Sequence, residues 1–424
     1  MKGIRWVVLA IVVLVTFVAY VLRSIPSIVG ESMMHDLGMT EYQLGMIFSA
    51  FAAGYTVFQF PGGILGDKFG SRRVISITII GCGVLTAFTA IVPGTGILPV
   101  SAIVAILIVT RFMVGLTQGP LFPVIIGGSI SRWFPVSQWG LPNGLTSVGA
   151  TLGGAATAPI VVWLMVAYGW RGALLILAPA GILVGILFRF YVSDDPAAHP
   201  AITNDELAVI ASARPPDGDA SEKGLWKVAL KNRNIQTITA GYFCSNYVFY
   251  LFFSWFFFYL VDVKGVPATE AGILIAMQWI LGAIGGLVGG VLCDVLVKRL
   301  GLRHGTRSLA IVALLLAGVF LYVGATADDP RIGVAWLSFA FACVQISEAP
   351  FWVATMAVSG RHASIGTGIL NTGGNIPGII GGIMVPVIAG LFGWQVAIAS
   401  GSVFAVTAAL LWLLIRADEP MSAV

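Results

Sequence analysis

Residues Gly63–Arg73, with the sequence GILGDKFGSRR, end the second apolar segment of the chain and decide its fold. A degenerate copy, Gly290–Arg307, has Asp294 in the place of Asp67 and again continues into a basic cluster. The two aspartates are 227 positions apart, just over half of the 424 residues. One Gly-x-x-x-Asp turn with basic residues would be an ordinary loop at a membrane edge. Two copies in equivalent places predict two homologous helical bundles in tandem.

The composition predicts an integral membrane protein. The chain is 58% hydrophobic and 10% charged, with a mean hydropathy of +0.95, whereas soluble domains carry roughly a quarter charged residues. A helix needs about 20 apolar residues to cross the hydrocarbon core of a bilayer. We predict twelve such spans, over 5–24, 41–62, 74–94, 98–126, 138–167, 171–192, 235–261, 269–296, 307–326, 332–358, 364–391 and 394–416.

These spans fall into two groups of six, separated by the one long polar segment. The predicted fold is all-α, with an N-terminal six-helix bundle over 1–192, a cytoplasmic linker over 193–234 and a C-terminal six-helix bundle over 235–424. Within the linker, Thr203 and Glu206 form a pattern typical of the start of a short helix.

The distribution of basic residues predicts the orientation. If the N-terminus is cytoplasmic, 18 of the 23 lysines and arginines lie on the inner side, as the positive-inside rule requires. Both termini are therefore predicted to be cytoplasmic, in the cytoplasmic membrane. The net charge of +4 then reflects topology and does not indicate a nucleic-acid partner.

The sequence gives no indication of an enzyme or a cofactor. The four cysteines fall in or at the ends of apolar spans, which predicts neither a disulfide framework nor a metal site. There is no phosphate-binding loop and no pair of nucleophile and base. The linker of 42 residues is also too short for a sizeable sensor domain.

The paired Gly-x-x-x-Asp loops resemble the signature of the major facilitator superfamily, and the match covers nearly the whole chain. Further segments resemble its anion:cation symporter branch, which includes sugar-acid/proton symporters and vesicular organic-anion transporters. They are Phe48–Gly63, Arg111–Pro123, Trp133–Pro135 and, in the linker, Asp195–Leu207. The resemblance implies two bundles around a central cavity, alternating access and a monomer.

Two arginines within the spans are candidates for binding the substrate, since a charge in mid-membrane costs several kcal/mol and usually marks a pathway. Arg111 lies well inside the fourth span, with Gln118 two turns further along the same face. Arg23 ends the first predicted span and shares a face with Tyr20. In the resembling symporters, arginines at both places hold the substrate carboxylate, to which a guanidinium can donate two parallel hydrogen bonds. The alternatives are a snorkelling residue for Arg23 and a structural ion pair or carbonyl clamp for Arg111.

The acids that those symporters place beside the arginines are missing. An aspartate precedes their first-span arginine, where this chain has Leu22, and their proton-carrying glutamate corresponds to Gln118. Neither side chain can titrate. The one acid deep in a span is Glu348, which could carry the proton or could neutralise Arg111.

The resemblance also implies the remaining site residues. Tyr55, Trp352 and Asn371 match positions that line the sugar-acid site, and Tyr247 and Tyr250 are further candidates. Two hydroxyl-binding positions of that site are occupied by Ala150 and Ala349, which indicates an anion smaller or less hydroxylated than a hexonate. The gate on the cytoplasmic side would be formed by Asp67, Arg72 and Asp294. Glycines 140–154 are interpreted as helix-packing residues, and Asn371–Gly378 as a bend.

The sequence thus predicts a secondary transporter for a small organic anion, with membrane lipid and possible protons as its other partners. Coupling is left open between proton symport through Glu348, anion exchange and facilitated diffusion. The alternative is a proton-coupled exporter of drugs or amphipathic solutes, which would require an acid in the pocket of the N-terminal half.

Overall fold

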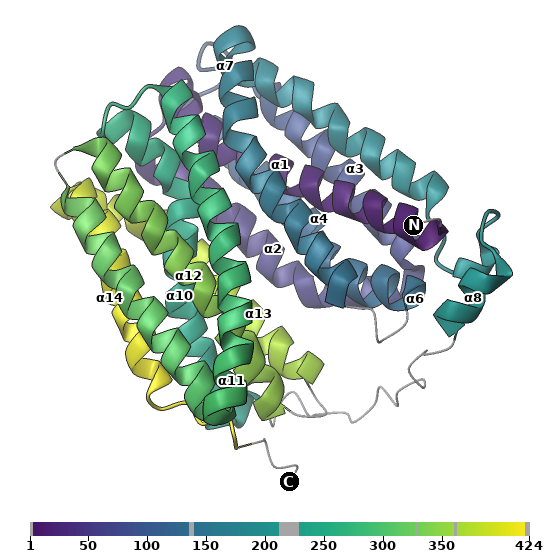
Figure 1. Ribbon diagram of the computed structural model, residues 1–424. Coiled ribbons are helices and arrows are strands. Elements are labelled where there is room, and N and C mark those ends of the chain that lie inside the picture. Colours follow the sequence, from purple (N-terminus) through teal and green to yellow (C-terminus); the bar gives the residue numbers. More distant parts are fainter. Residues whose placement is uncertain (1–2, 135–139, 212–228, 328, 360–362, 420–424) are drawn as a thin grey trace. The chain divides into compact units, whose positions relative to one another are not determined.

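The computed structural model describes residues 3–134, 140–211, 229–327, 329–359 and 363–419, and within helices the side chains of a few residues, Asp67 among them, lie outside the description. The described residues are helical or irregular, without a strand. They form two compact units (Figure 1). One comprises Met1–Gln43 and Ala50–Ala220, and the other comprises Leu44–Ser49 and Ser221–Val424.

The N-terminal unit is a bundle of long helices, drawn from purple to teal in Figure 1. Its elements are α1 (Ile4–Leu37), α2 (Glu41–Phe69), α3 (Ser71–Ala90), α4 (Val100–Gln118), α5 (Leu121–Val124), the π-helical turn η1 (Ile125–Ile130), α6 (Ser131–Trp133) and α7 (Gly140–Tyr191), followed by the 3₁₀ turn η3 (Pro196–Ala198) and the short helix α8 (Asn204–Ala211).

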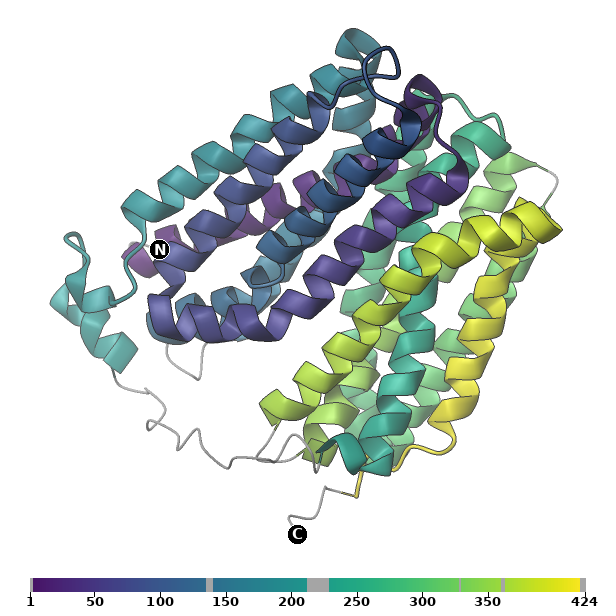
Figure 2. The same ribbon diagram turned by 180° about the vertical axis from the view of Figure 1, so that it is seen from behind.

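The C-terminal unit is a second bundle, drawn from green to yellow and seen from behind in Figure 2. Its elements are α10 (Arg233–Phe258), the π-helical turn η4 (Tyr259–Val263), α11 (Ala268–Thr326), α12 (Pro330–Ser359), α13 (Ala363–Phe392) and α14 (Trp394–Trp412). Helix α11 packs mainly on α12 and α14, and α10 packs on α13 and α14.

Two of these helices are too long for a single crossing. At about 1.5 Å per residue, the 52 residues of α7 and the 59 residues of α11 would each reach more than twice the hydrocarbon thickness of about 30 Å. Each contains a glycine with left-handed backbone angles, Gly169 (φ 69°) and Gly301 (φ 78°). At these glycines the chain turns back, so each long helix supplies two spans.

The described residues contain nine helices long and apolar enough to cross a membrane. Counting α7 and α11 twice and adding α2, whose bounds are Glu41–Phe69, the helices match the twelve predicted spans. The all-helical membrane fold is confirmed. The first two spans were predicted too short: α1 passes through Pro26 and ends at Leu37, before Gly38 (φ 64°), and α2 ends at Phe69, before Gly70 (φ 84°). The predicted bend at 371–378 does not interrupt α13.

Glycines allow the close packing of the N-terminal unit. A Cβ atom at Gly153 would collide with the backbone of Phe17, and one at Gly149 with Val13, so α7 lies directly against α1. The predicted packing role of this glycine series is therefore confirmed for Gly149 and Gly153.

Glycines also allow close packing between α2 and α4. A Cβ at Gly115 would overlap the carbonyl oxygen of Phe51, and one at Gly54 would overlap the carbonyl oxygen of Phe112. Because backbone meets backbone, neither glycine can be replaced without moving a helix. This contact brings the side chains on the neighbouring turns of α2 and α4 together.

The beginning of the linker packs on the N-terminal unit. Thr203 accepts a hydrogen bond from the backbone N–H of Glu206 (3.3 Å) at the start of α8, as predicted. The Glu206 carboxylate, however, accepts hydrogen bonds from the backbone N–H groups of Ile4 (3.0 Å) and Arg5 (2.9 Å). It therefore caps the first turn of α1, where a negative charge is favourable.

We expect Gly115→Ala to lower the melting temperature of the protein. Alanine is intrinsically better in a helix by about 1 kcal/mol, but the collision with the α2 backbone should cost about 1–3 kcal/mol. The control is Gly286→Ala in α11, where an added Cβ meets nothing within 4 Å. A melting temperature of Gly115→Ala equal to or above that of the control would contradict the close contact.

Candidate functional site

Arg111 is buried in the middle of α4, with 4% of its surface exposed. Its guanidinium carbon lies 5.1 Å from the centroid of the Phe51 ring of α2, a position fixed by the Gly54–Gly115 contact. The Nε atom has no hydrogen-bond partner among the described residues, and within the N-terminal unit no ion pair of Arg111 is found in the described part. Burial of a cation without an ion pair costs folding free energy. Such a cation is suited to binding an anionic ligand.

Arg23 is also buried, with 6% of its surface exposed, in the interior of α1. Its guanidinium carbon lies over three aromatic rings, at 4.6 Å from the centroid of Tyr55, 5.2 Å from Phe51 and 5.4 Å from Tyr20. The alternative of a snorkelling residue at the end of a span is therefore wrong, because α1 continues for fourteen residues beyond Arg23 to Leu37.

Phe51 brings the two arginines into one site. Both guanidinium carbons lie close to its ring, so they are no more than about 10 Å apart. The ring supplies a favourable electrostatic contact to each cation without neutralising either charge. Phe51 lies in the segment Phe48–Gly63, which resembles the symporter branch, but it was not predicted to be a site residue. Its spacing of four from Tyr55, on one face of a helix, is the signal that could have identified it.

Gln118 has a structural hydrogen bond. Its buried Nε2 donates to the carbonyl oxygen of Ala19 on α1, at 3.1 Å. An ionised carboxylate at this place could not donate that bond. Leu22 is also buried, and its side chain lies against Gly181 of α7. The two positions where the resembling symporters carry acids thus hold an amide with a backbone partner and a packed leucine.

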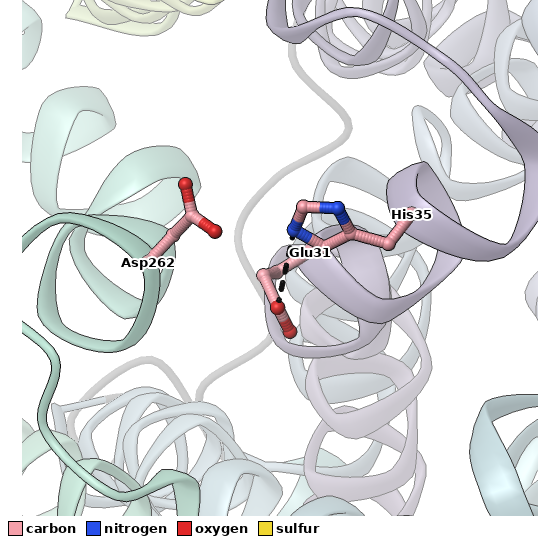
Figure 3. Close-up of side chains that lie close together, drawn as sticks. All are labelled: Glu31, His35 and Asp262. Carbon is pink, nitrogen blue, oxygen red and sulfur yellow. Dashed lines mark ion pairs between the residues drawn. The ribbon is translucent and has the colours of Figure 1, made fainter.

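The acids of α1 lie in its last two turns and have partners there. Glu31 is 3.4 Å from His35 one turn later (Figure 3). Asp36 accepts hydrogen bonds from Trp170 and Arg171 of α7, at the turn around Gly169.

In the C-terminal unit, Glu348 on α12 accepts hydrogen bonds from neutral groups. The hydroxyl of Tyr242 on α10 lies 3.2 and 3.1 Å from the two carboxylate oxygens, and the indole N–H of Trp352 lies 2.9 Å from Oε2. Trp352, predicted to line the substrate site, therefore contacts the predicted coupling residue. Tyr242 was missed, and its partnership with Glu348, 106 residues away, has no local signature in the sequence.

A second series of hydrogen bonds connects side chains of α10 and α13. The hydroxyl of Tyr250 donates to Oδ1 of Asn375 (2.7 Å), whose Nδ2 donates to the carbonyl of Asn371 (2.7 Å). Glycines make room for the rings: a Cβ at Gly378 would meet the Tyr250 ring, and one at Gly374 would meet the Tyr242 ring. The structure thus brings Asn371 and Tyr250 together through Asn375.

Tyr247 does not belong to this group. It is buried against α14, where it stacks on Phe404 (3.9 Å between ring centroids) and shares a hydrogen bond with Ser400 (3.0 Å). Its role is packing, and the candidate assignment to a cavity is not supported.

The three residues predicted to form the cytoplasmic gate, Asp67, Arg72 and Asp294, differ in their contacts. The Nε of Arg72 donates to the carbonyl of Arg189 at the end of α7 (2.6 Å). Asp294 is exposed on α11 and has no hydrogen bond or ion pair with a described residue. The side chain of Asp67 lies outside the described part. The gate role of the three residues stays a prediction.

The first turn of α3 has a partner that the sequence did not reveal. Oδ1 of Asp194 accepts hydrogen bonds from the Ser71 hydroxyl (2.8 Å) and the Arg72 backbone N–H (2.7 Å). Its carboxylate lies where a Cβ of Gly70 would be, which is one reason for glycine there. Asp194 therefore acts as the helix cap that Gly70 cannot supply.

The chain belongs to the Major Facilitator Superfamily, whose sequence model matches residues 12–301. It is a multi-pass membrane protein and a secondary transporter, and it is not an enzyme. The predicted superfamily is thereby confirmed.

The chain is similar to transporters of organic acids. It is 30% identical over 380 residues to the probable sulfoacetate transporter SauU of Cupriavidus necator, covering 89% of this chain and 85% of that protein. It is 29% identical over 400 residues to the probable galactarate/D-glucarate transporter GudP of Bacillus subtilis, covering 92% and 87%. These relatives confirm the predicted anion branch.

Solved structures support the fold. The chain aligns with a bacterial homologue of the human lysosomal transporter Spinster, with a TM-score of 0.81 at 17% identity, over 98% of this chain and 97% of that one. At this identity the likeness establishes the fold alone.

We expect Asp194→Ala to lower the melting temperature, because two donors at the start of α3 lose their acceptor at a cost of about 0.5–2 kcal/mol. Asp194→Asn keeps an acceptor oxygen and should lose less. The control is Asp205→Ala on the exposed face of α8. Equal melting temperatures for Asp194→Ala and the control would contradict the capping role.

Proposed function

We propose that this protein moves a small organic anion across the cytoplasmic membrane by alternating access. The observation that carries the proposal is the pair of buried arginines, Arg23 and Arg111, whose guanidinium groups share the Phe51 ring. Buried guanidinium groups bind carboxylates and sulfonates strongly, since their hydrogen bonds are charge-assisted and can be bidentate.

The relatives support an anionic substrate. Their names specify sulfoacetate, galactarate or D-glucarate, and in another relative D-galactonate, all of which are organic anions. Tyr20, Tyr55 and Gln118 would shape the site in the N-terminal unit, and for the C-terminal unit Trp352 and Asn371 are the proposed substrate-binding residues. The distribution of basic residues supports cytoplasmic termini, and the protein would act as a monomer, as the superfamily resemblance implies.

Two observations bear on the coupling. Gln118 and Leu22 remove the usual titrating pair, which favours exchange, because an empty site with buried arginines is costly to reorient. Glu348, in contrast, accepts hydrogen bonds from the neutral groups of Tyr242 and Trp352 among the described residues of its own unit. A carboxylate that is paired with neutral donors is a candidate for carrying a proton, which favours symport. Nothing in the described residues favours the drug-export alternative.

Arg111→Ala should abolish binding of the anion, since it removes a buried cation for which no ion pair is found among the described residues of its unit. Binding is measured by isothermal titration or thermal shift with malonate, succinate and sulfoacetate, because a ligand at a hundred times its dissociation constant stabilises by about 2.7 kcal/mol. The control is Arg331→Ala, an exposed arginine paired with Glu270. Retained affinity in Arg111→Ala would rule out the proposed site.

Glu348→Gln tests the coupling in proteoliposomes. If Glu348 carries the proton, wild-type uptake rises as the external pH falls, and the glutamine variant, which still accepts hydrogen bonds from Tyr242 and Trp352, loses this dependence. Glu270→Gln is the matched control and should keep it. Uptake that is independent of pH in the wild type but requires an internal anion would instead establish exchange.

A further inference from the structure

The turn in the middle of α11 places a basic segment at one surface of the membrane. Because the chain turns back at Gly301, the residues on either side of this glycine lie where the two spans of α11 end. The ten residues Lys298–Arg307 contain four lysines and arginines, one histidine and no acid. Basic clusters next to a membrane span attract anionic lipid head groups. Exposed cations alone would provide a diffuse attraction, so the contacts of the individual side chains decide whether a site is formed.

Two of these four basic residues are built into the structure. Arg303 and Arg307 lie one turn apart on the same face of α11, and both are half-buried. In each of them the Nε atom is buried and has no hydrogen-bond partner among the described residues. Like charges at this spacing destabilise a helix, and buried donors without an acceptor add to the cost. The pair is therefore suited to an anionic acceptor. Lys298 and Arg299, in contrast, are exposed.

The segment after α14 forms the other side of this site. Arg307 donates a hydrogen bond from Nη2 to the carbonyl oxygen of Ile415. The next residue, Arg416, is fixed by the side chain of Asn234 near the start of α10. Its backbone N–H donates to Oδ1 and its carbonyl accepts from Nδ2, each at 3.1 Å. Arg303 and Arg416 are both close enough for their charges to act on Arg307. Three guanidinium groups thus converge where the turn of α11 meets the end of α14.

The nearby acids leave donors of this cluster available. Asp418 forms a long ion pair with Arg303, in which 3.9 Å separate Oδ1 from Nε, and this is beyond hydrogen-bond distance. Glu419 accepts a hydrogen bond from Nη1 of Arg416 (3.1 Å). Both carboxylates are exposed, and exposed ion pairs contribute little to stability. The guanidinium group of Arg303 donates no hydrogen bond to a described residue.

An apolar surface continues from these arginines along the two helices. The second span of α11 packs closely on α14, since a Cβ at Gly318 would lie 3.2 Å from the side chain of Val406. Between this contact and the arginines, both helices expose apolar side chains, namely Val312, Leu315, Leu316, Leu410, Leu413 and Leu414. A phospholipid offers a phosphate to the arginines and acyl chains to these side chains, whereas a soluble anion offers only the charge. The combination favours a phospholipid as the occupant.

We infer that the C-terminal unit binds an anionic phospholipid where the turn of α11 meets the end of α14. The phosphate group accepts hydrogen bonds from Arg303 and Arg307, whose planar forks match its oxygens, and Arg416 adds a third positive charge. The acyl chains lie along the apolar side chains of α11 and α14. The bound lipid supplies a counter-charge to the arginine pair and so stabilises the C-terminal unit. The inference does not depend on the proposed function, because it involves none of the residues proposed to bind the substrate.

Ligands that differ in charge and in acyl chains test this inference. Purified full-length protein in a neutral detergent, washed free of native lipid, is titrated with dioleoyl phosphatidylglycerol, dioleoyl phosphatidylcholine and glycerol 1-phosphate, and binding is measured by the rise in melting temperature. We expect the phosphatidylglycerol to bind at least about tenfold more tightly than either of the others, because choline brings a cation to the arginines and glycerol 1-phosphate has no acyl chains.

Either of two results with the wild-type protein would overturn the inference. If the phosphatidylcholine binds as tightly as the phosphatidylglycerol, the charge of the head group plays no part. If glycerol 1-phosphate binds as tightly as the phosphatidylglycerol, the site binds a soluble phosphate and the assignment to a lipid is wrong.

Paired variants assign the lipid to the two arginines. In Arg303→Gln/Arg307→Gln the preference for phosphatidylglycerol over phosphatidylcholine should fall to about one. The control Lys298→Gln/Arg299→Gln removes the same charge from exposed positions at the same turn and should keep the preference. Equal losses in the two double variants would indicate a diffuse attraction to surface charge and contradict the site. If the arginine variant does not fold, the exposed Arg416→Gln decides the question: its affinity for phosphatidylglycerol should fall about threefold or more, and an unchanged affinity would contradict the site.

Discussion

Two guanidinium groups buried at one phenylalanine ring are the constraint on which the N-terminal unit depends. Arg23 and Arg111 both lie over Phe51, with 6% and 4% of their surfaces exposed. Burial of a charge is costly unless a counter-charge is present, and this unit has no acid in the helices α3, α4 and α7. Under the proposed function, an anion bound at Arg111 would supply a counter-charge to this buried cation.

The glycine contacts hold this arrangement in place. Backbone touches backbone at Gly54 and Gly115, so α2 and α4 cannot separate without losing the positions of Phe51 and Arg111. At the ends of the bundle, Asp194 caps α3 and Glu206 caps α1. These two carboxylates bind the beginning of the linker to the helices whose first turns they satisfy, so the linker is part of the N-terminal unit up to α8.

The charged group inside the C-terminal unit is a carboxylate, whereas those inside the N-terminal unit are guanidinium groups. Its deep acid, Glu348, is held by a phenol and an indole, and within that unit no cation among the described residues pairs with it. The N-terminal unit thus holds two buried guanidinium groups at one ring, and the C-terminal unit holds a half-buried carboxylate with neutral hydrogen-bond donors.

The sequence by itself determined the class of fold, the superfamily and the charged residues that matter. The reason is that each apolar span must satisfy its backbone hydrogen bonds within its own helix, so that length, hydropathy and the two Gly-x-x-x-Asp copies are local signals. A charge inside such a span is equally visible in the sequence, as Arg111 and Glu348 were. Only the tertiary structure decided which neighbours these charges have: Phe51 between the two arginines, Tyr242 beside Glu348, Asp194 at the start of α3, and the burial of Arg23 within a longer α1. Those contacts join residues far apart in the chain, and they depend on how closely glycines let particular helices approach, which no local pattern encodes.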